Sequence, residues 1–259
     1  MPFADLNLGK LFYQEADFPA PQGLNGTLVL IHGAGGSHQR WEKQLRPGIP
    51  GWKLVAVDLP GHGASGGSAG GEVSEYADAV AELIAKKEFP RPRVLAGHSL
   101  GGAIALVTAL AHPAVVDGLV LIGSGARLPV NPKMLEQLAA ESLDPGFLKI
   151  AYGPDFPPDL LQQELELWHR APQQQLFKDF TACNRYDVSE RLSSLRVPVL
   201  ILVGDQDKMT PVKSSQFLNQ NIPGSTLCII AGSGHHLMLE KPAETNQALS
   251  EFLARSFPV

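Results

Sequence analysis

The chain has 259 residues, of which 44% are hydrophobic and 18% are charged. This composition is typical of a soluble globular protein with a sizeable core, in one large domain or two small ones. The formal net charge of −5, the lack of any run of Lys or Arg and the short apolar runs argue against nucleic acid or a membrane as the main partner.

The N-terminal segment and the cysteines point to a reducing compartment. Residues 1–8 contain neither the basic nor the apolar stretch of a signal peptide, so we expect none. Cys183 and Cys228 lie far apart and lack metal-ligand spacing. We therefore expect two free thiols in a cytoplasmic protein.

The first third of the chain alternates between strand-like and helical segments. A hairpin is predicted over residues 3–16, and the apolar runs at 27–31 and 54–57 are typical of parallel strands buried on both faces. A helix is predicted over residues 72–87. Its large apolar side chains share one face: Tyr76, Val80, Leu83 and Ile84.

A short strand at residues 94–96 leads almost directly into a helix at 100–111, with the sequence Gly97-His98-Ser99-Leu100-Gly101 between them. This G-x-S-x-G turn is very sharp, and the glycines remove Cβ atoms that would clash there. We expect the Ser99 hydroxyl at the helix N-terminus. Backbone N–H groups at that point favour the negative charge that develops on an attacked carbonyl.

Residues 63–67 also read G-x-S-x-G, but they continue into further small residues, Ser68 to Gly71, with no helix directly after them. We therefore assign Ser65 to a loop. The strand, turn and helix around Ser99 resemble the most specific motif of the α/β-hydrolase family. The resemblance implies a mostly parallel sheet flanked by helices, with Ser99 as the nucleophile.

A strand predicted at residues 118–122 is the sixth, and no strand-like run follows it until residue 197. Residues 127–187 instead contain helical segments broken by prolines. Ligands of α/β folds bind at the carboxyl ends of the strands, so we interpret residues 127–187 as a helical lid over Ser99. The alternative is a peripheral helical decoration. Residues 1–126 and 188–259 then form the α/β core.

The α/β alternation then resumes with two strands and two helices, over residues 197–203, 225–231, 211–221 and 242–254. A loop with candidate catalytic residues follows each strand. A serine needs a base to take its proton, and a carboxylate must hold that base in the right tautomer. The first loop offers Asp205 and Asp207 and the second offers His235 and His236, and their spacing alone leaves both choices open.

The family resemblance decides between these residues. Family members usually read Gly-x-x-Asp followed closely by Pro, which falls on Asp207, and Gly-His five residues before Glu-x-Pro, which falls on His235. Asp205 is then expected to be a turn or helix-capping residue. The resemblance also implies that the backbone N–H groups of Ala34 and Leu100 form the oxyanion hole.

The remaining candidates lie around this constellation. We expect Gly33, His98 and Trp168 to contribute to substrate binding. We also expect three histidines to anchor loops through hydrogen bonds rather than to do chemistry: His32, His62 and His98.

The resemblance implies a mechanism in two halves. His235 removes the Ser99 proton and Ser99 attacks a carbonyl; His235 then protonates the leaving group and activates the water that releases the acyl-enzyme. Asp207 orients the imidazole and stabilises its cation. We expect no metal and no organic cofactor.

Two other classes of protein remain as alternatives. Residues 32–38 follow a strand and Asp58 ends the next one, as in a dinucleotide-binding site, but His38 stands where that fingerprint needs a third glycine or alanine. An NAD-dependent oxidoreductase is therefore disfavoured. A non-catalytic small-molecule receptor could keep the same fold and the same triad, because a fold does not fix a function.

Among enzymes, a serine rather than an aspartate at position 99 argues against haloalkane dehalogenase and epoxide hydrolase chemistry. Carboxylesterases, lipase-like enzymes, lactonases, carbon–carbon bond hydrolases and the lyase of menaquinone synthesis remain. Because residues 127–187 are rich in apolar side chains and have few cations, we expect a carboxylesterase for small to medium apolar acyl groups. A carbon–carbon hydrolase or lactonase is the alternative. The expected partner is a small-molecule ester, and the expected state a monomer or small homo-oligomer.

Overall fold

The protein is described by a computed structural model that covers residues 2–68 and 71–258. The strands are β1 (Phe3–Leu6), β2 (Gly9–Phe18), β3 (Gly26–Ile31), β4 (Trp52–Val57), β5 (Arg93–His98), β6 (Gly118–Ile122), β7 (Val199–Gly204) and β8 (Thr226–Ile230). Within the described residues they form one eight-stranded sheet in the order β1-β2-β4-β3-β5-β6-β7-β8. The β1–β2 and β2–β4 pairs are antiparallel and the other neighbours are parallel. The sheet is thus mostly parallel, as predicted.

The central strands are buried on both faces. Val29 and Ile31 of β3 belong to one apolar cluster, whereas Leu28 and Leu30 belong to another. Successive side chains of a strand point to opposite faces of the sheet, so the two clusters are its two sides. All four side chains are fully buried. The unbroken apolar run at this strand therefore reflects cover on both sides.

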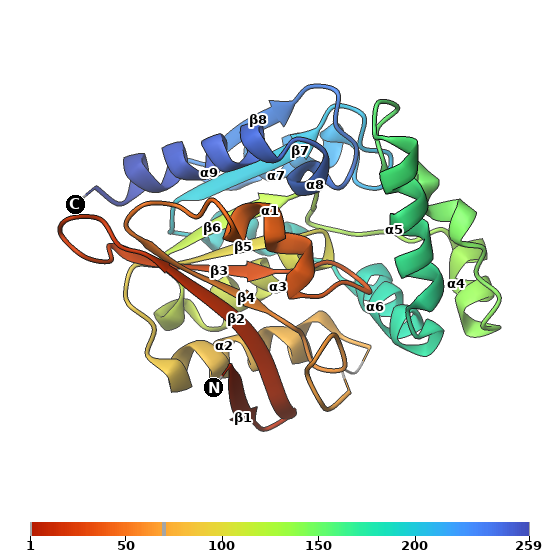
Figure 1. The fold of residues 1–259 in the computed structure, drawn as a ribbon, viewed down its shortest axis with the longest axis horizontal. Coiled ribbons are helices and arrows are strands. Elements are labelled where there is room, and N and C mark those ends of the chain that lie inside the picture. The colour runs from red at the N-terminus through yellow and green to blue at the C-terminus, as the bar shows by residue number, and fades with distance from the viewer. Residues whose placement is uncertain (1, 69–70, 259) are drawn as a thin grey trace.

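Helices cover the two faces of the sheet (Figure 1). Among those that contribute to the cluster of Val29 and Ile31 are α2 (Val73–Lys87), α3 (Leu100–Ala111) and α7 (Val212–Asn221). Those that contribute to the opposite cluster are η1 (His38–Trp41), α1 (Glu42–Leu45), α8 (Leu237–Glu240) and α9 (Pro242–Ser256). Short 3₁₀ turns complete the core, η2 (Pro113–Val115) and η4 (Ser189–Ser194).

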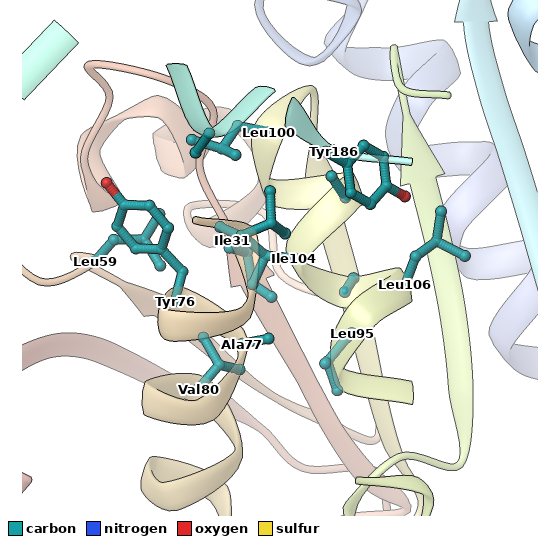
Figure 2. Packing of buried hydrophobic residues seen from close by; sticks show 14 of the residues in the cluster. Ile31, Leu59, Tyr76, Ala77, Val80, Leu95, Leu100, Ile104, Leu106 and Tyr186 are labelled. Atoms are coloured by element: carbon teal, nitrogen blue, oxygen red, sulfur yellow. The ribbon is translucent and has the colours of Figure 1, made fainter. Parts of the chain in front are cut away.

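The helix α2 shows how its sequence pattern becomes packing. Its four predicted core residues, Tyr76, Val80, Leu83 and Ile84, are fully buried. Figure 2 shows Tyr76 and Val80 in the same group of side chains as Ile31 of β3. The apolar stripe therefore binds α2 to the sheet.

Between β6 and β7 the chain forms a separate group of helices at one end of the sheet (Figure 1). They are α4 (Pro132–Ala139), η3 (Pro145–Ala151), α5 (Pro158–Arg170) and α6 (Gln173–Arg185). An isolated β-bridge joins Arg127 to Asp187 where this excursion begins and ends. We call residues 127–187 the cap segment.

Most elements predicted from the sequence are present, with small shifts at their ends. The strand predicted from residue 197 begins at Val199, because Pro198 has no N–H group to donate to a neighbouring strand.

Cys183 is a buried free thiol and Cys228 a partly buried one. None of the helices in residues 2–68 and 71–258 is long and apolar enough to cross a membrane. Residues 69 and 70, in the small-residue stretch after Ser65, lie outside the described residues.

Candidate active site

Ser99 lies at the turn between β5 and α3, in a backbone conformation that side chains rarely adopt, with φ 54° and ψ −117°. A Cβ atom on Gly97 would lie 2.1 Å from the carbonyl oxygen of Gly101, and one on Gly101 would lie 2.2 Å from that of Ile31. The Ser99 N–H also donates to the carbonyl of Ile122 in β6. Both glycines are therefore needed for the close approach that holds this strained serine in place.

The loops after β7 and β8 bring Asp207 and His235 together. Nδ1 of His235 lies 2.8 Å from Oδ2 of Asp207, and both side chains are buried. Asp207 also accepts hydrogen bonds from the backbone N–H groups of Met209 and Thr210 and from the Thr210 hydroxyl. Burial alone would raise the pKa of Asp207, but the charge and hydrogen bond of His235 and the Thr210 donors lower it below its usual value. The carboxylate is therefore ionised and holds the proton of His235 on Nδ1.

The alternative residues of these two loops lie elsewhere. Asp205 is exposed and accepts a hydrogen bond of 2.8 Å from the Gly232 N–H, which joins the two loops to each other instead of capping a helix. The ring of His236 stacks on Tyr152, with centroids 4.8 Å apart. The structure thus places Asp207, and not Asp205, against His235.

Ser99 and His235 line the same narrow cavity, which has a volume of about 30 Å³. Of the residues expected to bind substrate, Gly33, His98 and Trp168 also line it. Its other walls come from the cap segment and from neighbouring loops: Ala34, Gly36, Arg40, Leu148, Ala151, Phe180, Met209 and His236. No hydrogen bond joins the described side chains of Ser99 and His235. Such bonds are often long in an enzyme without substrate and shorten in the complex.

The loop between β3 and η1 lies directly against the Ser99 turn. A Cβ atom on Gly33 would lie 2.9 Å from Nδ1 of His98 and 3.2 Å from Cβ of Ser99. Ala34 follows in this loop, and Leu100 follows Ser99 as the first residue of α3. In the described part of the chain, neither the Ala34 nor the Leu100 N–H donates a hydrogen bond to another residue. Both backbone N–H groups therefore have no acceptor among the described residues and are able to donate to a bound group.

A buried carboxylate of the cap segment holds the loop that carries Ala34. Oδ2 of Asp179 in α6 accepts hydrogen bonds of 2.8 Å from the Gly35 N–H and from Nε2 of His62. Its Oδ1 accepts bonds from the Tyr76 hydroxyl at 2.5 Å and the Gln175 amide at 3.0 Å. Burial alone would raise the pKa of Asp179, but His62 and the other donors lower it. Asp179 is not among the residues predicted to form the site.

The histidines expected as loop anchors do make loop contacts. His32 accepts a hydrogen bond from the Leu59 N–H, and burial lowers its pKa to about 3, so the ring is neutral. Nε2 of His98 lies 3.0 Å from the carbonyl of His235.

Asp58 is fully buried and accepts hydrogen bonds from the backbone N–H groups of His38 and Ala64. A buried and occupied carboxylate has no place for a ribose, which removes the basis of the dinucleotide interpretation.

Two further features of the site concern charge. Among the described residues, no group of three or more His, Cys, Asp or Glu side chains could hold a metal ion. Arg40 of η1 contributes a guanidinium to the cavity wall, where it forms an ion pair with Glu164 of α5. The few cations of residues 127–187 gave no sign of this charge, because Arg40 comes from the core.

A family profile, related sequences and a solved structure all agree on the kind of protein that this chain resembles. The profile of the "Alpha/beta hydrolase family" matches residues 28–248. A pimeloyl-[acyl-carrier protein] methyl ester esterase of Neisseria meningitidis serogroup C is 32% identical over 227 residues, which cover 80% of this chain and 86% of that protein. A putative carbamate hydrolase RutD of Agrobacterium fabrum is 28% identical over 242 residues, 88% of this chain and 92% of that one. A solved thermophilic esterase superposes with a TM-score of 0.85 at 31% identity, over 98% of this chain and 97% of that one.

Proposed function

The chain belongs to the alpha/beta hydrolase family and is a hydrolase of the esterase type, and from this premise we propose that it cleaves carboxylic esters through Ser99, His235 and Asp207. The observation that carries the proposal is a shared cavity, which Ser99 and His235 both line. Oδ2 of Asp207 lies 2.8 Å from Nδ1 of His235. This is the arrangement of nucleophile, base and orienting acid.

The proposed reaction begins with proton transfer from Ser99 to Nε2 of His235. This nitrogen is open to accept because Nδ1 keeps its proton, which it donates to Asp207. The Ser99 oxygen attacks the ester carbonyl, and the Ala34 and Leu100 N–H groups bind the oxyanion. His235 then gives its proton to the leaving alcohol, and an acyl group remains on Ser99. Water attacks this acyl-enzyme, with His235 as the base, and releases the acid.

We propose further that the cap segment acts as a lid and sets the acyl preference. The cavity of about 30 Å³ has room for about one or two water molecules, so a substrate must displace part of its wall. Apolar side chains form the cap side of that wall: Leu148, Ala151, Trp168 and Phe180. Such a wall favours apolar acyl groups and excludes water once it closes.

Hydrolysis of 4-nitrophenyl esters from acetate to palmitate tests the proposal. Ser99→Ala should lower kcat/KM by at least about 10⁴-fold, because the nucleophile is lost. The chain-length profile of the unmodified protein then gives the size of the acyl pocket.

Ser65→Ala is the matched control, because Ser65 is the serine of the second G-x-S-x-G sequence. Its hydroxyl donates to the carbonyl of Asp58 and accepts from the Phe12 N–H. This substitution should leave ester hydrolysis in place. Activity that survives in Ser99→Ala would refute the proposal. Inactivity of the unmodified protein towards every ester would favour carbon–carbon bond hydrolysis, the lyase reaction or a receptor.

A further inference from the structure

Arg40 stands at the boundary between the cavity of Ser99 and a larger outer cleft. The cleft has a volume of about 940 Å³, and residues 35–46 and α5 supply most of its walls. Gly36, Arg40 and Trp168 line both spaces. A substrate that reaches from Ser99 into the cleft therefore passes the guanidinium of Arg40.

The Arg40 side chain is fixed at this point and only 12% exposed. It forms an ion pair with Glu164, which also accepts a hydrogen bond of 2.8 Å from the Tyr152 hydroxyl. The guanidinium lies 5.9 Å from the ring centre of Trp168. A guanidinium has five N–H donors, and in the described residues Glu164 accepts from one of its nitrogens, Nη1. Donors therefore remain for a bound molecule.

The surroundings of Arg40 favour an anion. Four Lys and Arg side chains line the outer cleft against two Glu side chains, although the whole chain carries a charge of −5. In the inner cavity, burial keeps the pKa of His236 well below its usual value, and the positive charge of Arg40 lowers it further. His98 is likewise held neutral, mainly by burial. Arg40 is thus the fixed cation of the wall that faces Ser99.

We infer that Arg40 determines specificity by binding a carboxylate that the substrate carries beside its scissile ester. The inference rests on the proposed esterase function and refines its substrate class: half-esters of dicarboxylic acids, or esters of alcohols that bear a carboxylate. A guanidinium matches the planar, two-oxygen geometry of a carboxylate. Glu164 positions Arg40 along one edge, and the substrate carboxylate binds along another.

Two pairs of esters test this subsite and separate the two sources of the carboxylate. The mono-4-nitrophenyl ester of glutaric acid is compared with 4-nitrophenyl hexanoate, and 4-acetoxybenzoate with phenyl acetate. The quantity measured is the ratio of kcat/KM for the charged ester to that for its neutral partner. Changes in leaving group cancel when this ratio is compared between variants.

Arg40→Gln should lower the ratio by about tenfold for at least one pair, the loss expected for a hydrogen bond to a charged group. Glu164→Gln should raise it by about threefold, because it removes the competing anion. Arg46→Gln is the matched control: Arg46 also lines the cleft, but its side chain is 78% exposed and pairs with Glu42. It should change the ratio by less than about twofold.

A merely structural role of the Arg40–Glu164 pair predicts a different pattern. Loss of either partner would then change both esters of a pair alike and leave the ratio constant. A constant ratio in Arg40→Gln overturns the inference while the esterase proposal stands. Calorimetric titration with glutarate gives a readout that needs no hydrolysis: binding should weaken in Arg40→Gln, and equal binding would also overturn the inference.

Discussion

Among the described residues, two Asp–His pairs have the same separation and are both buried, and we propose a different role for each. His235 and Asp207 lie 2.8 Å apart beside Ser99, and His62 and Asp179 lie 2.8 Å apart between the core and the cap segment. Both pairs are almost completely inaccessible to solvent. Distance and burial therefore do not distinguish the pair that we propose as catalytic from a structural pair.

The difference lies in the second ring nitrogen of each histidine. Nδ1 of His62 lies 3.1 Å from the carbonyl of Pro60, while Nε2 contacts the Asp179 carboxylate. Both partners are acceptors, so both nitrogens carry protons and the ring is a cation. Burial alone would lower the pKa of His62, but the hydrogen bond and charge of Asp179 raise it. A histidine becomes a base only where one nitrogen stays open to a substrate, as proposed for Nε2 of His235.

The largest expected effect concerns the pair beside Ser99. Asp207→Asn should lower kcat by about 10⁴-fold, because an amide favours the wrong tautomer of His235 and cannot stabilise its cation. Steady-state hydrolysis of 4-nitrophenyl acetate measures this loss. A fall of less than about tenfold would show that another group orients His235.

The second effect is on stability. Asp179→Asn should lower the free energy of unfolding by about 3 kcal/mol, because it leaves the buried cation of His62 without its counter-ion. Urea unfolding followed by tryptophan fluorescence measures this difference. A variant as stable as the unmodified protein would contradict the assignment of His62 as a cation.

The pH dependence of this stability difference has a definite sign. The folded pKa of Asp179 is lowered, so its contribution is present above its usual value of about 4 and is lost as the pH falls through the lower folded pKa. The folded pKa of His62 is raised, so its contribution is present below about 6.5 and is lost as the pH rises through the folded pKa. The difference between the two proteins should therefore be largest between about pH 4 and 6.5 and shrink on either side. A difference that does not vary with pH would contradict this ionisation.

A smaller effect is expected on catalysis by the same variant. Asp179→Asn should lower kcat by about tenfold with little change in KM, because Gly35 loses a charged acceptor and the adjacent Ala34 N–H is held less well. Tyr76→Phe is the control, because it removes a donor to the other carboxylate oxygen and leaves the Gly35 contact. Equal losses in both variants would indicate a general structural effect.

The smallest effect is predicted for Asp205→Asn. Its exposed carboxylate accepts a backbone N–H from Gly232, and an amide oxygen can accept the same bond. We expect less than about a twofold change in kcat/KM. A loss as large as that of Asp207→Asn would exchange the roles assigned to the two aspartates.

Much of the fold follows from local patterns. The unbroken apolar run at residues 27–31 indicates a strand that is buried on both faces. The helix face that carries Tyr76 and Val80 indicates a helix that packs against the sheet. The Ser99 turn is readable because close packing requires glycine at 97 and 101. Such features depend on residues that are close together in the chain, so they can be predicted from the sequence.

The residues that could not be predicted from the sequence make contacts between segments that lie far apart in the chain. Asp179 contacts Gly35, 144 positions away, and Arg40 pairs with Glu164, 124 positions away. One signal for Asp179 does exist: it lies on the apolar face of α6 between the buried residues Leu176 and Cys183. A carboxylate on a buried helix face needs a partner. No comparable local signal marks Arg40, because its partner Glu164 lies in α5, far away along the chain.

The most direct test of the central claim is covalent labelling of the nucleophile. A 4-nitrophenyl phosphonate reacts with an activated serine to leave a stable phosphonyl ester and release 4-nitrophenol. Mass spectrometry of the intact protein and its peptides should find one adduct, on Ser99, formed far more slowly in Asp207→Asn and absent from Ser99→Ala. An adduct on another residue, or equal labelling of Ser99→Ala, would contradict the assignment of Ser99 as the serine activated by His235 and Asp207.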